Sequence, residues 1–471
     1  MSTSHFFARK LLFRVCSNIC RYERPTLLHS RAFCSAKPAS LSSRALGCVN
    51  GFLRSSTEVK PRGSLRLTHS RARNDPELAA EPLRATDVQK NVGKRWVDVT
   101  WNDDSVTSYP YVWLRDNCQC SKCFHPTTKS RQVLMMDLDP KIEPKQVQVI
   151  DDGSLKVTWP DGHESPYPSE WLHERAFTDA ARRKRNEVYG QKHKFWGAEL
   201  QDKIPTYDFS KICSDENHLL DWLLGMELHG IALIRNAPQR TGELEKIAQQ
   251  ICFTRRTNYG ESFQVESKTD PSNLAYTNVK LGLHCDLPFY YYVPGLQFLH
   301  CVVNSSTGGS NVFADASYAA KIMETEYPEM YEILSTRLVD YYDIGTDAYT
   351  FHKVARWPNF VRDNEGNVKG VCYNNQVRDT FMNLPIEDVQ PLYEALRKFD
   401  DIMYDPNNHV KHTLKAGDII CFDNIRVLHG REEYDIGSDG HRHLEGIYID
   451  WDEVQSRIRV LKSELNRTNS S

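Results

Sequence analysis

The chain has 471 residues, which is enough for two or three domains, and 40% of them are hydrophobic and 26% charged, as in ordinary globular proteins. No run of about 18 apolar residues is present, so the sequence predicts no transmembrane helix and no membrane insertion. The net charge of −3 is unevenly distributed, because residues 1–73 carry 14 Lys and Arg against two acids and the remainder is acidic. The folded part therefore lacks the basic footprint of a protein whose partner is nucleic acid.

The first 75 residues have the composition of a targeting segment. They are rich in Arg and Ser, poor in acids, and begin with aromatic, aliphatic and basic residues around Arg9 and Arg14. This composition is typical of a mitochondrial transit peptide, whereas the apolar run is too short and too interrupted for a secretory signal. We expect residues 1–75 to direct the protein to the mitochondrial matrix, with a cytoplasmic location as the alternative. The alternative interpretation of this segment is a disordered basic tail that binds nucleic acid.

Three of the 13 cysteines, Cys118, Cys120 and Cys123, lie within six residues of one another. In a reducing compartment such a cluster indicates a metal site more often than disulfides. A strand-like run and a Pro-Asp-Gly turn precede His163, which can complete a tetrahedral zinc site from a hairpin tip. His125 is a competitor, but it lies close to Cys123 and is restricted by the following proline. We predict structural zinc on the three cysteines and His163, with free, partly buried thiols as the alternative.

Residues 76–178 are predicted to form a small β-rich module that contains this zinc site. Its strand candidates are residues 95–100, 147–150 and 155–159. The stretch 171–185 is predicted to be a helical linker with a solvated basic face. A larger module, with the catalytic candidates described below, then spans residues 189–471.

The larger module begins with helices and continues mostly with strands. Asp215 and Thr241 can each cap a helix with an apolar stripe, and residues 230–235 between these helices have the pattern of a buried strand. Further strand candidates are residues 297–303, 310–313, 371–373, 419–423 and 443–450. A C-terminal helix begins at Asp452. Short strands with turn signals and a few packing helices predict a mainly β fold with a double-sheet core.

His284 and Asp286 stand two residues apart in a strand-like segment, so both side chains point to the same face. His429 supplies a third ligand at the end of a strand–loop–strand pattern, and Gly430 beside it allows close backbone approach. Two histidines and one carboxylate form the facial triad of non-haem Fe(II) oxygenases, with positions left open for a 2-oxo acid and dioxygen. Arg442, which enters the next strand, is suited to bind the far carboxylate of that acid.

A rival metal site uses His441, His443 and Glu445, which alternate along one predicted strand. If these side chains faced inward they could bind a metal. Arg442 would then point away from the site, and His429 would be left without a role.

Two other classes of function remain open at this point. The first is a zinc-containing binding module with a basic arm, which would bind nucleic acid in a salt-dependent way. The second is a cysteine hydrolase that uses Cys285 or Cys421 with a nearby histidine. Neither cysteine is predicted at a helix N-terminus, where its thiolate would be favoured.

From about residue 99 to the C-terminus, the sequence resembles the Fe(II)- and 2-oxoglutarate-dependent dioxygenases of carnitine biosynthesis. The resemblance rests on the motifs Trp-Leu-Arg-Asp-Asn-Cys118, Thr-Trp-Pro-Asp-Gly-His163, Phe-Trp196-Gly-Ala-Glu-Leu, Asn273-Leu-Ala-Tyr276-Thr, His284-Cys-Asp286, Thr307-Gly-Gly, Phe-Asp-Asn424-Ile-Arg-Val-Leu-His429-Gly-Arg and Arg442-His-Leu-Glu-Gly-Ile-Tyr448. It implies a double-stranded β-helix (jelly-roll) catalytic core, an N-terminal zinc module and a homodimer. Both metal assignments made above agree with it.

The resemblance also implies a small-molecule substrate with a trimethylammonium group, which aromatic faces attract through their ring quadrupoles. The positions that line this aromatic cage are matched by Tyr259, Phe263, Tyr276 and Tyr448. Phe263 departs from the tryptophan expected there, so we expect a modestly weaker cage.

Asn273 and Asn375 match positions that hydrogen-bond the substrate carboxylate. Where Asn273 stands, the trimethyllysine-hydroxylating members have an acidic residue that suits an extra ammonium group. The implied reaction is therefore C3 hydroxylation of gamma-butyrobetaine to L-carnitine with release of succinate and CO2, and trimethyllysine is the alternative substrate. The implied cofactors are Fe(II), the cosubstrate 2-oxoglutarate and zinc, with ascorbate as a further candidate. No catalytic residue beyond the metal ligands is expected.

Overall fold

The computed structural model describes residues 82–266, 275, 277–435 and 441–468. The expected targeting segment, residues 1–75, lies outside this part of the chain, as do the expected substrate contacts Asn273 and Tyr276. Within the described ranges, no helix is both long and apolar enough to cross a membrane.

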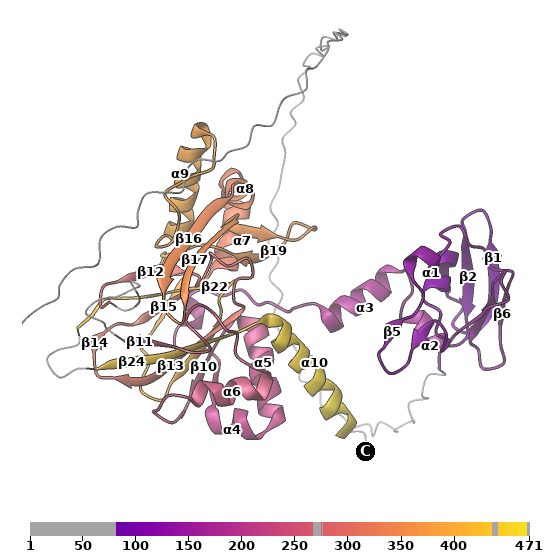
Figure 1. The fold of residues 1–471 in the computed structure, drawn as a ribbon, viewed down its shortest axis with the longest axis horizontal. Helices are drawn as coiled ribbons and strands as arrows, with labels where there is room; N and C mark the ends of the chain where they lie inside the picture. The colour runs from indigo at the N-terminus through magenta and orange to yellow at the C-terminus, as the bar shows by residue number, and fades with distance from the viewer. Residues whose placement is uncertain (1–81, 267–274, 276, 436–440, 469–471) are drawn as a thin grey trace, which may run out of the picture. The chain divides into compact units, whose positions relative to one another are not determined.

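Two small antiparallel sheets make up the N-terminal part (Figure 1). Their strand orders are β1–β2–β3 and β6–β7–β8, with bounds β1 Ala85–Asn91, β2 Trp96–Trp101, β3 Val106–Pro110, β6 Gln146–Val149, β7 Leu155–Thr158 and β8 Glu164–Tyr167. Alternate residues of β2, such as Val97 and Val99, are buried in a core cluster of this part of the chain. The three strands expected here are present, each within one residue at either end.

Short elements connect and follow these sheets. They are α1 Tyr111–Asp116, β4 Phe124–His125, β5 Ser130–Arg131, the 3₁₀ turn η1 Met135–Asp137 and α2 Ser169–His173. Thr178 then accepts a hydrogen bond from the backbone N–H of Ala181 and begins α3, Asp179–Tyr189, whose side chains are not buried. The linker expected at 171–185 is therefore two helices with a break between them, and its basic residues are solvated as expected.

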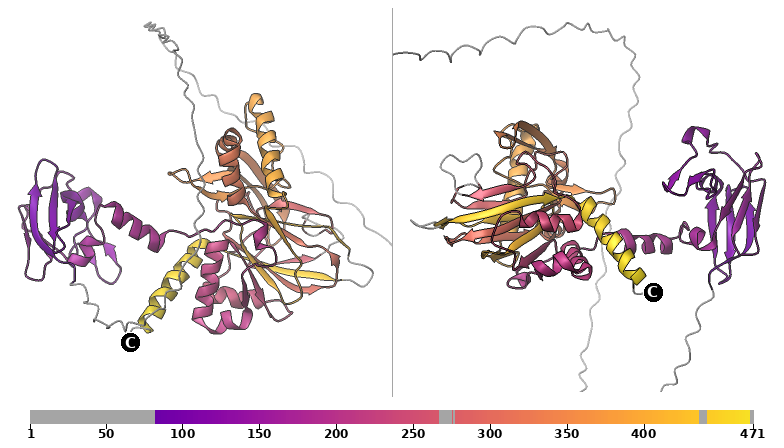
Figure 2. Two further views of the ribbon diagram at one scale, coloured as in Figure 1. Left: turned by 180° about the vertical axis from the view of Figure 1, so that it is seen from behind. Right: turned by 60° about the horizontal axis from the view of Figure 1, so that its bottom comes forward.

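Two sheets form the core of the C-terminal part (Figure 2). The first has the order β11–β24–β13–β21–β10–β9, with bounds β11 Phe263–Glu266, β24 Arg442–Ile449, β13 Leu296–Asn304, β21 Ile419–Asp423, β10 Ile231–Arg235 and β9 Thr206–Asp208. The second has the order β12–β22–β15–β20, with bounds β12 Leu281–His284, β22 Val427–Arg431, β15 Asn311–Asp315 and β20 His409–His412. Leu299 and Leu444 from the first sheet pack with Phe313 and Val427 from the second. The expected double-sheet core is therefore confirmed.

Helices cover the outer face of each sheet (Figure 1). The six-stranded sheet packs against α4 Phe209–Ser214, α5 Glu216–His229, α6 Glu243–Ile251 and α10 Trp451–Thr468. The four-stranded sheet packs against α7 Ala316–Glu326, α8 Pro328–Thr336 and α9 Ile386–Met403. The sequence predicts mainly strands in this region, and α7–α9 were not predicted. Pro391 inside α9 makes that helix hard to recognise in the sequence, because proline in a helix interior usually marks a break, whereas Pro328 is at the start of α8, where proline is tolerated.

The remaining elements are short and lie around the core. They are η2 Ala198–Leu200, the pair β14 Thr307–Gly308 and β23 Tyr434–Asp435, the pair β16 Val339–Thr346 and β17 Thr350–Trp357, and the pair β18 Phe360–Arg362 and β19 Val368–Val371. The strand expected at 371–373 overlaps only the last residue of β19.

The two expected helix caps have different outcomes. Asp215 caps α5 as predicted, since its carboxylate accepts the backbone N–H of Asn217. The prediction for Thr241 is wrong, because α6 begins after Gly242, which has a left-handed backbone with φ 86°. The carboxylate of Glu445 accepts the Gly242 N–H at 2.9–3.0 Å, so a side chain from a distant strand replaces the local cap.

Candidate active site

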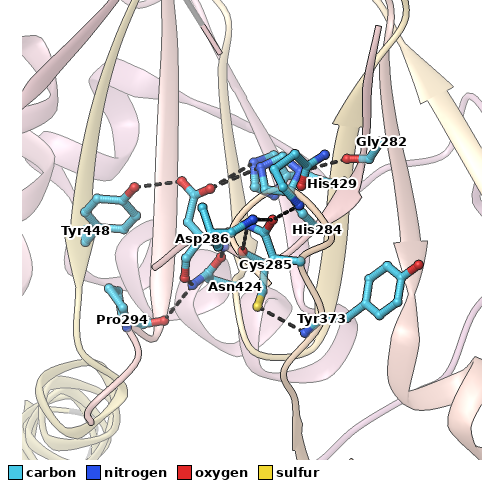
Figure 3. Close-up of polar contacts among 12 residues, drawn as sticks. Gly282, His284, Cys285, Asp286, Pro294, Tyr373, Asn424, His429 and Tyr448 are labelled. Carbon is cyan, nitrogen blue, oxygen red and sulfur yellow. Dashed lines mark hydrogen bonds and ion pairs between the residues drawn. The ribbon is translucent and has the colours of Figure 1, made fainter. Parts of the chain in front are cut away.

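His284, Asp286 and His429 converge on one point, where β12 and β22 pair (Figure 3). The two histidines are direct partners in the antiparallel register, and their ring centroids are 4.2 Å apart. Oδ1 of Asp286 lies 3.2 Å from Nε2 of His284 and 3.8 Å from Nε2 of His429. The three ligand atoms all lie within 4.8 Å of one another, so one cation can contact all three.

Hydrogen bonds aim two of these ligands at the common point. Nδ1 of His284 donates to the carbonyl oxygen of Gly282 at 2.8 Å, which leaves the lone pair of Nε2 directed toward Asp286. On the other side of the carboxylate, the hydroxyl of Tyr448 donates to Oδ2 of Asp286 at 2.7 Å (Figure 3). Oδ1 therefore remains the oxygen that faces the two histidines.

Asn424 braces the backbone that carries Asp286 (Figure 3). Its side-chain oxygen accepts the Asp286 N–H at 2.7 Å, and its Nδ2 donates to the carbonyls of Asp286 at 3.0 Å and Pro294 at 3.1 Å. The next residue, Leu287, is buried and has a left-handed backbone with φ 58°, which is strained for a residue with a side chain. The amide of Asn424 helps to hold this turn, a role that its place in a sequence motif does not reveal.

Electrostatics keep the ligands in the protonation states that a metal requires. Burial alone would raise the pKa of Asp286, but its close contacts, first with His284 and then with His429, outweigh burial and lower this pKa below its ordinary value. Burial, together with the nearby His284, lowers the pKa of His429 to about 3. His429 is thus a neutral imidazole near pH 7, which is the form that binds metals.

A cavity next to the triad contains three of the four expected cage residues, and Tyr276 is the fourth, outside the described residues. Tyr259, Phe263 and Tyr448 line this cavity together with His284 and Asp286. The ring centroids of Tyr259 and Phe263 are 5.7 Å apart, and the rings of Phe263 and Tyr448 are stacked at 5.2 Å. Tyr448 therefore belongs both to the aromatic wall and to the bracing of the metal ligands.

Gly446 on β24 makes room for this aromatic wall. A Cβ atom at this position would overlap the ring of Phe263, which lies against the strand. This role of Gly446 could not be predicted from the sequence, because the close approach joins two strands that are far apart in sequence.

The structure does not bring Asn375 into the cavity. Its side chain is exposed and donates to the hydroxyl of Tyr373 at 3.2 Å, whereas the neighbouring Asn374 and Gln376 line the cavity. Asn374 is buried and donates to the carbonyl of Cys285 at 3.0 Å. The chain bends at residues 375–377, where the side-chain oxygen of Asn374 accepts the N–H groups of Gln376 and Val377, so an assignment that is one residue off moves the amide out of the site.

Two buried guanidinium groups lie near the ring of Tyr434. The guanidinium carbon of Arg442 is 5.0 Å from the ring centroid and that of Arg431 is 4.7 Å from it. Among the residues that the structure describes, neither arginine has an acidic partner, and Nε of Arg431 is buried without a hydrogen bond. Burial and the charge of Arg442 lower the pKa of Arg431 to about 10. Such a pair of desolvated cations favours an anionic ligand.

Arg431 is a residue that the sequence analysis misses. It stands two residues after His429 on β22 and also donates to the backbone carbonyls of Ala275, Thr277 and Val279 at 2.8–3.2 Å. The sequence does contain a signal for Arg431: a charged residue two positions after the metal-binding His429 on a strand points to the same face as this histidine.

The residues present fit an iron ion and a dicarboxylate cosubstrate. Two imidazole nitrogens and one carboxylate oxygen are the donor set of the facial triad, with other positions left for ligands. Arg442 and Arg431 are buried positive charges, a setting that suits a carboxylate ligand.

Cys118, Cys120, Cys123 and His163 form a second cluster, in the N-terminal part. Nε2 of His163, on the β7–β8 hairpin, lies 3.3, 3.6 and 3.5 Å from the three sulfurs in that order. In a tetrahedral zinc site, Zn–S bonds of about 2.3 Å and Zn–N bonds of about 2.0 Å place sulfur and nitrogen about 3.5 Å apart. The cluster therefore fits zinc, and the competitor His125 is exposed and not part of it.

The rival site of His441, His443 and Glu445 is not formed. Glu445 is turned to the N-terminus of α6, while Arg442 takes the inward position beside Tyr434. The two histidines instead lie near Glu266 of β11, with ligand atoms within 4.8 Å of one another.

Neither cysteine proposed as a hydrolase nucleophile is available for that role. Cys285 and Cys421 are both completely buried, and burial raises the pKa of Cys421 well above its ordinary value. A catalytic thiolate needs partial exposure and a lowered pKa.

Sequence comparisons decide the family of this chain. The profile described as "Taurine catabolism dioxygenase TauD, TfdA family" matches residues 187–448. The chain belongs to this dioxygenase family. A profile described as "Gamma-butyrobetaine hydroxylase-like, N-terminal" matches residues 88–173 of the same dioxygenase. The protein is an Fe(II)- and 2-oxoglutarate-dependent enzyme with the jelly-roll core of the family, as the sequence analysis predicts.

Full-length relatives of this dioxygenase carry two different names. Gamma-butyrobetaine dioxygenase of Homo sapiens is 37% identical, over 80% of this chain and 97% of that protein, and the enzyme of the same name from Pseudomonas sp. (strain AK-1) is 36% identical, over 78% and 94%. The mitochondrial trimethyllysine dioxygenase of Homo sapiens is 31% identical, over 76% of this chain and 84% of that protein. Among solved structures, asparagine oxygenase with Fe(II), 2S,3S-3-hydroxyasparagine and succinate aligns at 12% identity with a TM-score of 0.39, over 52% of this chain and 93% of that chain.

Proposed function

We propose that this dioxygenase hydroxylates gamma-butyrobetaine at C3 and forms L-carnitine, succinate and CO2. One observation carries the proposal: the hydroxyl of Tyr448, a residue of the aromatic wall, donates to the carboxylate of Asp286. The cation site and the metal site therefore share one residue. A substrate whose cation contacts the aromatic rings has its carbon chain next to the metal ligands.

His284, Asp286 and His429 hold the iron, and Arg442 binds the far carboxylate of 2-oxoglutarate, with Arg431 adding positive charge nearby. When bound, iron and 2-oxoglutarate supply the oxidising chemistry, in which dioxygen contributes one oxygen atom to succinate and one to the product. The protein contributes position rather than acid–base catalysis. The Gly282 carbonyl, Tyr448 and Asn424 keep the ligands fixed, so the reacting carbon is selected by where the substrate is held.

Tyr259, Phe263 and Tyr448 attract the trimethylammonium group through their ring faces. Tyr276 completes this cage and Asn273 binds the substrate carboxylate, both by resemblance to the carnitine-biosynthesis enzymes. Asn374, which lines the cavity, replaces Asn375 as the second amide next to the substrate. An amide at position 273 favours gamma-butyrobetaine over trimethyllysine, because it offers no negative charge to a second ammonium group. The higher identity to gamma-butyrobetaine dioxygenases supports the same choice.

The test is iron-dependent succinate release, measured with gamma-butyrobetaine and trimethyllysine side by side. We expect turnover with gamma-butyrobetaine to exceed that with trimethyllysine at equal concentration. Equal or reversed rates would contradict gamma-butyrobetaine as the preferred substrate. Absence of succinate with both compounds would contradict hydroxylation of either one by this enzyme. Measurements with and without ascorbate show whether a reductant is needed to keep the iron as Fe(II).

We also propose that Cys118, Cys120, Cys123 and His163 bind structural zinc, since four protein ligands leave no position open for a substrate. The module at 76–178 and the catalytic domain at 189–471 form homodimers, and residues 1–75 direct import into mitochondria. Light scattering after size-exclusion chromatography tests the dimer. A reporter fused to residues 1–75 tests import, and a diffuse cytosolic signal would contradict it.

A further inference from the structure

We propose that His441, His443 and Glu266 form a third metal site, which binds a borderline divalent cation of the zinc class. Nδ1 of His443 lies 3.3 Å and Nε2 of His441 3.9 Å from Oε1 of Glu266. The three ligand atoms lie within 4.8 Å of one another, as in the iron triad. The site is formed by two strands, because Glu266 of β11 is the direct partner of His443 on β24.

The hydrogen bonds behind His443 determine which of its nitrogens faces the site. The carboxylate of Glu445 accepts from Gly242 N–H and from Nε2 of Gln264, so the amide oxygen of Gln264 is turned toward His443. That oxygen lies 2.6 Å from Nε2 of His443 and accepts a hydrogen bond from the protonated Nε2. Nδ1 of a neutral His443 then presents a lone pair to Glu266.

A lone pair and a carboxylate oxygen at 3.3 Å repel each other unless a cation lies between them. A metal ion removes this repulsion and uses both atoms as ligands. The arrangement also matches the common support of a metal-bound histidine, in which the distal ring N–H donates to a fixed oxygen. A proton on Nδ1 of His443 would also remove the repulsion. In that case His443 and Glu266 would form an ion pair and no metal would bind.

The backbone near His441 is fixed, although its side chain is exposed. The Ser305 N–H and hydroxyl both donate to the carbonyl of His441, at 2.9 and 3.0 Å, and the His441 N–H donates to the hydroxyl of Ser305 at 2.6 Å. The β11–β24 register fixes the other two ligands. The three side chains therefore start from anchored positions, and binding requires little reorganisation.

Two imidazoles and one carboxylate suit zinc, with water in the remaining positions, because this mixed nitrogen and oxygen donor set is neither soft nor purely hard. The side chains of His441 and Glu266 are 58% and 41% exposed, so a cation can enter from solvent. Arg442 stands between the two histidines in the sequence, and Glu266 ends the strand that begins with Phe263. A cation here would join the strand of the 2-oxoglutarate anchor to the strand of the aromatic wall.

The experiment counts zinc ions on the full-length protein. Asp286→Ala serves as the parent, so that the iron site does not compete, and zinc per chain is measured by mass spectrometry after dialysis against buffered micromolar zinc. His441→Asn and Glu266→Gln are made in this parent. His218→Asn is the matched control, because His218 is an exposed histidine 2.7 Å from Asp215 that belongs to no three-ligand group in the described part of the chain.

We expect His441→Asn and Glu266→Gln to hold one zinc ion fewer per chain than the parent, and His218→Asn to hold the same number as the parent. Zinc should also raise the melting temperature of the parent and of His218→Asn more than that of the two site variants. Equal zinc content in the parent and in both site variants would overturn the proposal. Neither readout uses turnover, so failure of this site is distinguishable from failure of the proposed reaction.

Discussion

The iron triad and the Cys3His cluster differ in what holds their ligands in place. In the triad, His284 and Asp286 have partners outside the metal site, namely Gly282, Tyr448 and Asn424. In the cluster, the sulfurs of Cys118, Cys120 and Cys123 are grouped around one histidine nitrogen, and Nη1 of Arg115 also donates to the sulfur of Cys123 at 3.4 Å. The triad is thus arranged mainly by the protein, with positions open for chemistry, whereas zinc in the cluster would use all four ligands.

The two sites should differ in whether folding depends on the metal. The triad lies on two strands of a sheet with a large buried core, so its geometry should survive without iron. The cluster joins the α1–β4 loop to the β7–β8 hairpin, and its zinc would supply the connection. Removal of the two metals should therefore have opposite consequences, loss of structure in one case and loss of activity in the other.

The largest effect is expected for Cys123→Ser. Structural zinc contributes about 10–16 kcal/mol to the folding of zinc-finger peptides, and the N-terminal part has a core of its own, so we expect a loss of several kcal/mol here. Zinc content should fall by one ion per chain, and limited proteolysis should cut within residues 82–178. Cys213→Ser, at a half-buried cysteine outside the cluster, is the control and should change neither measurement. A Cys123→Ser protein that retains zinc and protease resistance would remove the contrast between the two sites.

Asp286→Ala should have the converse result. Loss of one metal ligand removes several kcal/mol of transition-state stabilisation, so succinate release should fall about a thousandfold or more. The fold should persist, because Asn424 holds the backbone of residue 286 rather than its carboxylate. The melting temperature should stay close to that of the wild type, and zinc at the Cys3His cluster should be retained. A variant with a melting temperature far below that of the wild type would show that the triad also stabilises the fold.

The sequence predicts the triad and the cluster better than it predicts their support. His284 and Asp286 share a strand face by local periodicity, and Cys118 to Cys123 are adjacent, so both patterns can be read without a structure. The supporting residues act across long separations, as when Tyr448 donates to Asp286. Such pairs depend on strand order and register, which the sequence does not display.

Other residues show the same limit. Thr241 is a plausible helix cap, but Glu445 from β24 takes over this role at Gly242. Asn375 matches a motif, yet the side chain that lines the cavity is that of Asn374. Local chemistry predicted the type of group in both cases, a side-chain oxygen at the helix start and an amide at the cavity, and the tertiary structure determines which residue supplies it.

Tyr448→Phe tests whether the triad is arranged by the protein. The variant keeps the ring in the aromatic wall and removes the hydrogen bond to Oδ2 of Asp286. Loss of a partner of a metal ligand typically costs about 10- to 100-fold in metal affinity or activity, and we expect a loss in that range for Fe(II) affinity. Tyr290→Phe is the control, since its hydroxyl bonds to Asn258 and not to a metal ligand. Equal Fe(II) affinity in the wild type and Tyr448→Phe would show that the hydroxyl does not position Asp286.

The smallest effect is expected for Phe263→Trp, which changes the aromatic wall without contact to the metal ligands. A larger ring quadrupole should strengthen the attraction of the trimethylammonium group by about 0.5–1 kcal/mol, which lowers KM for gamma-butyrobetaine about two- to fivefold. We expect kcat to change little, because this attraction is present before and during the reaction.

The matched control for Phe263→Trp is a change of substrate rather than of protein. In a neutral analogue the quaternary nitrogen is replaced by carbon, so shape is kept and the charge is lost. A cation–π effect should disappear with this analogue, whereas an effect of ring size should remain. The ring at position 263 also has to fit against Gly446, where a Cβ atom would already overlap phenylalanine. A higher KM for both compounds would therefore mean that the backbone of β24, rather than the strength of the cation–π interaction, is the reason for phenylalanine at this position.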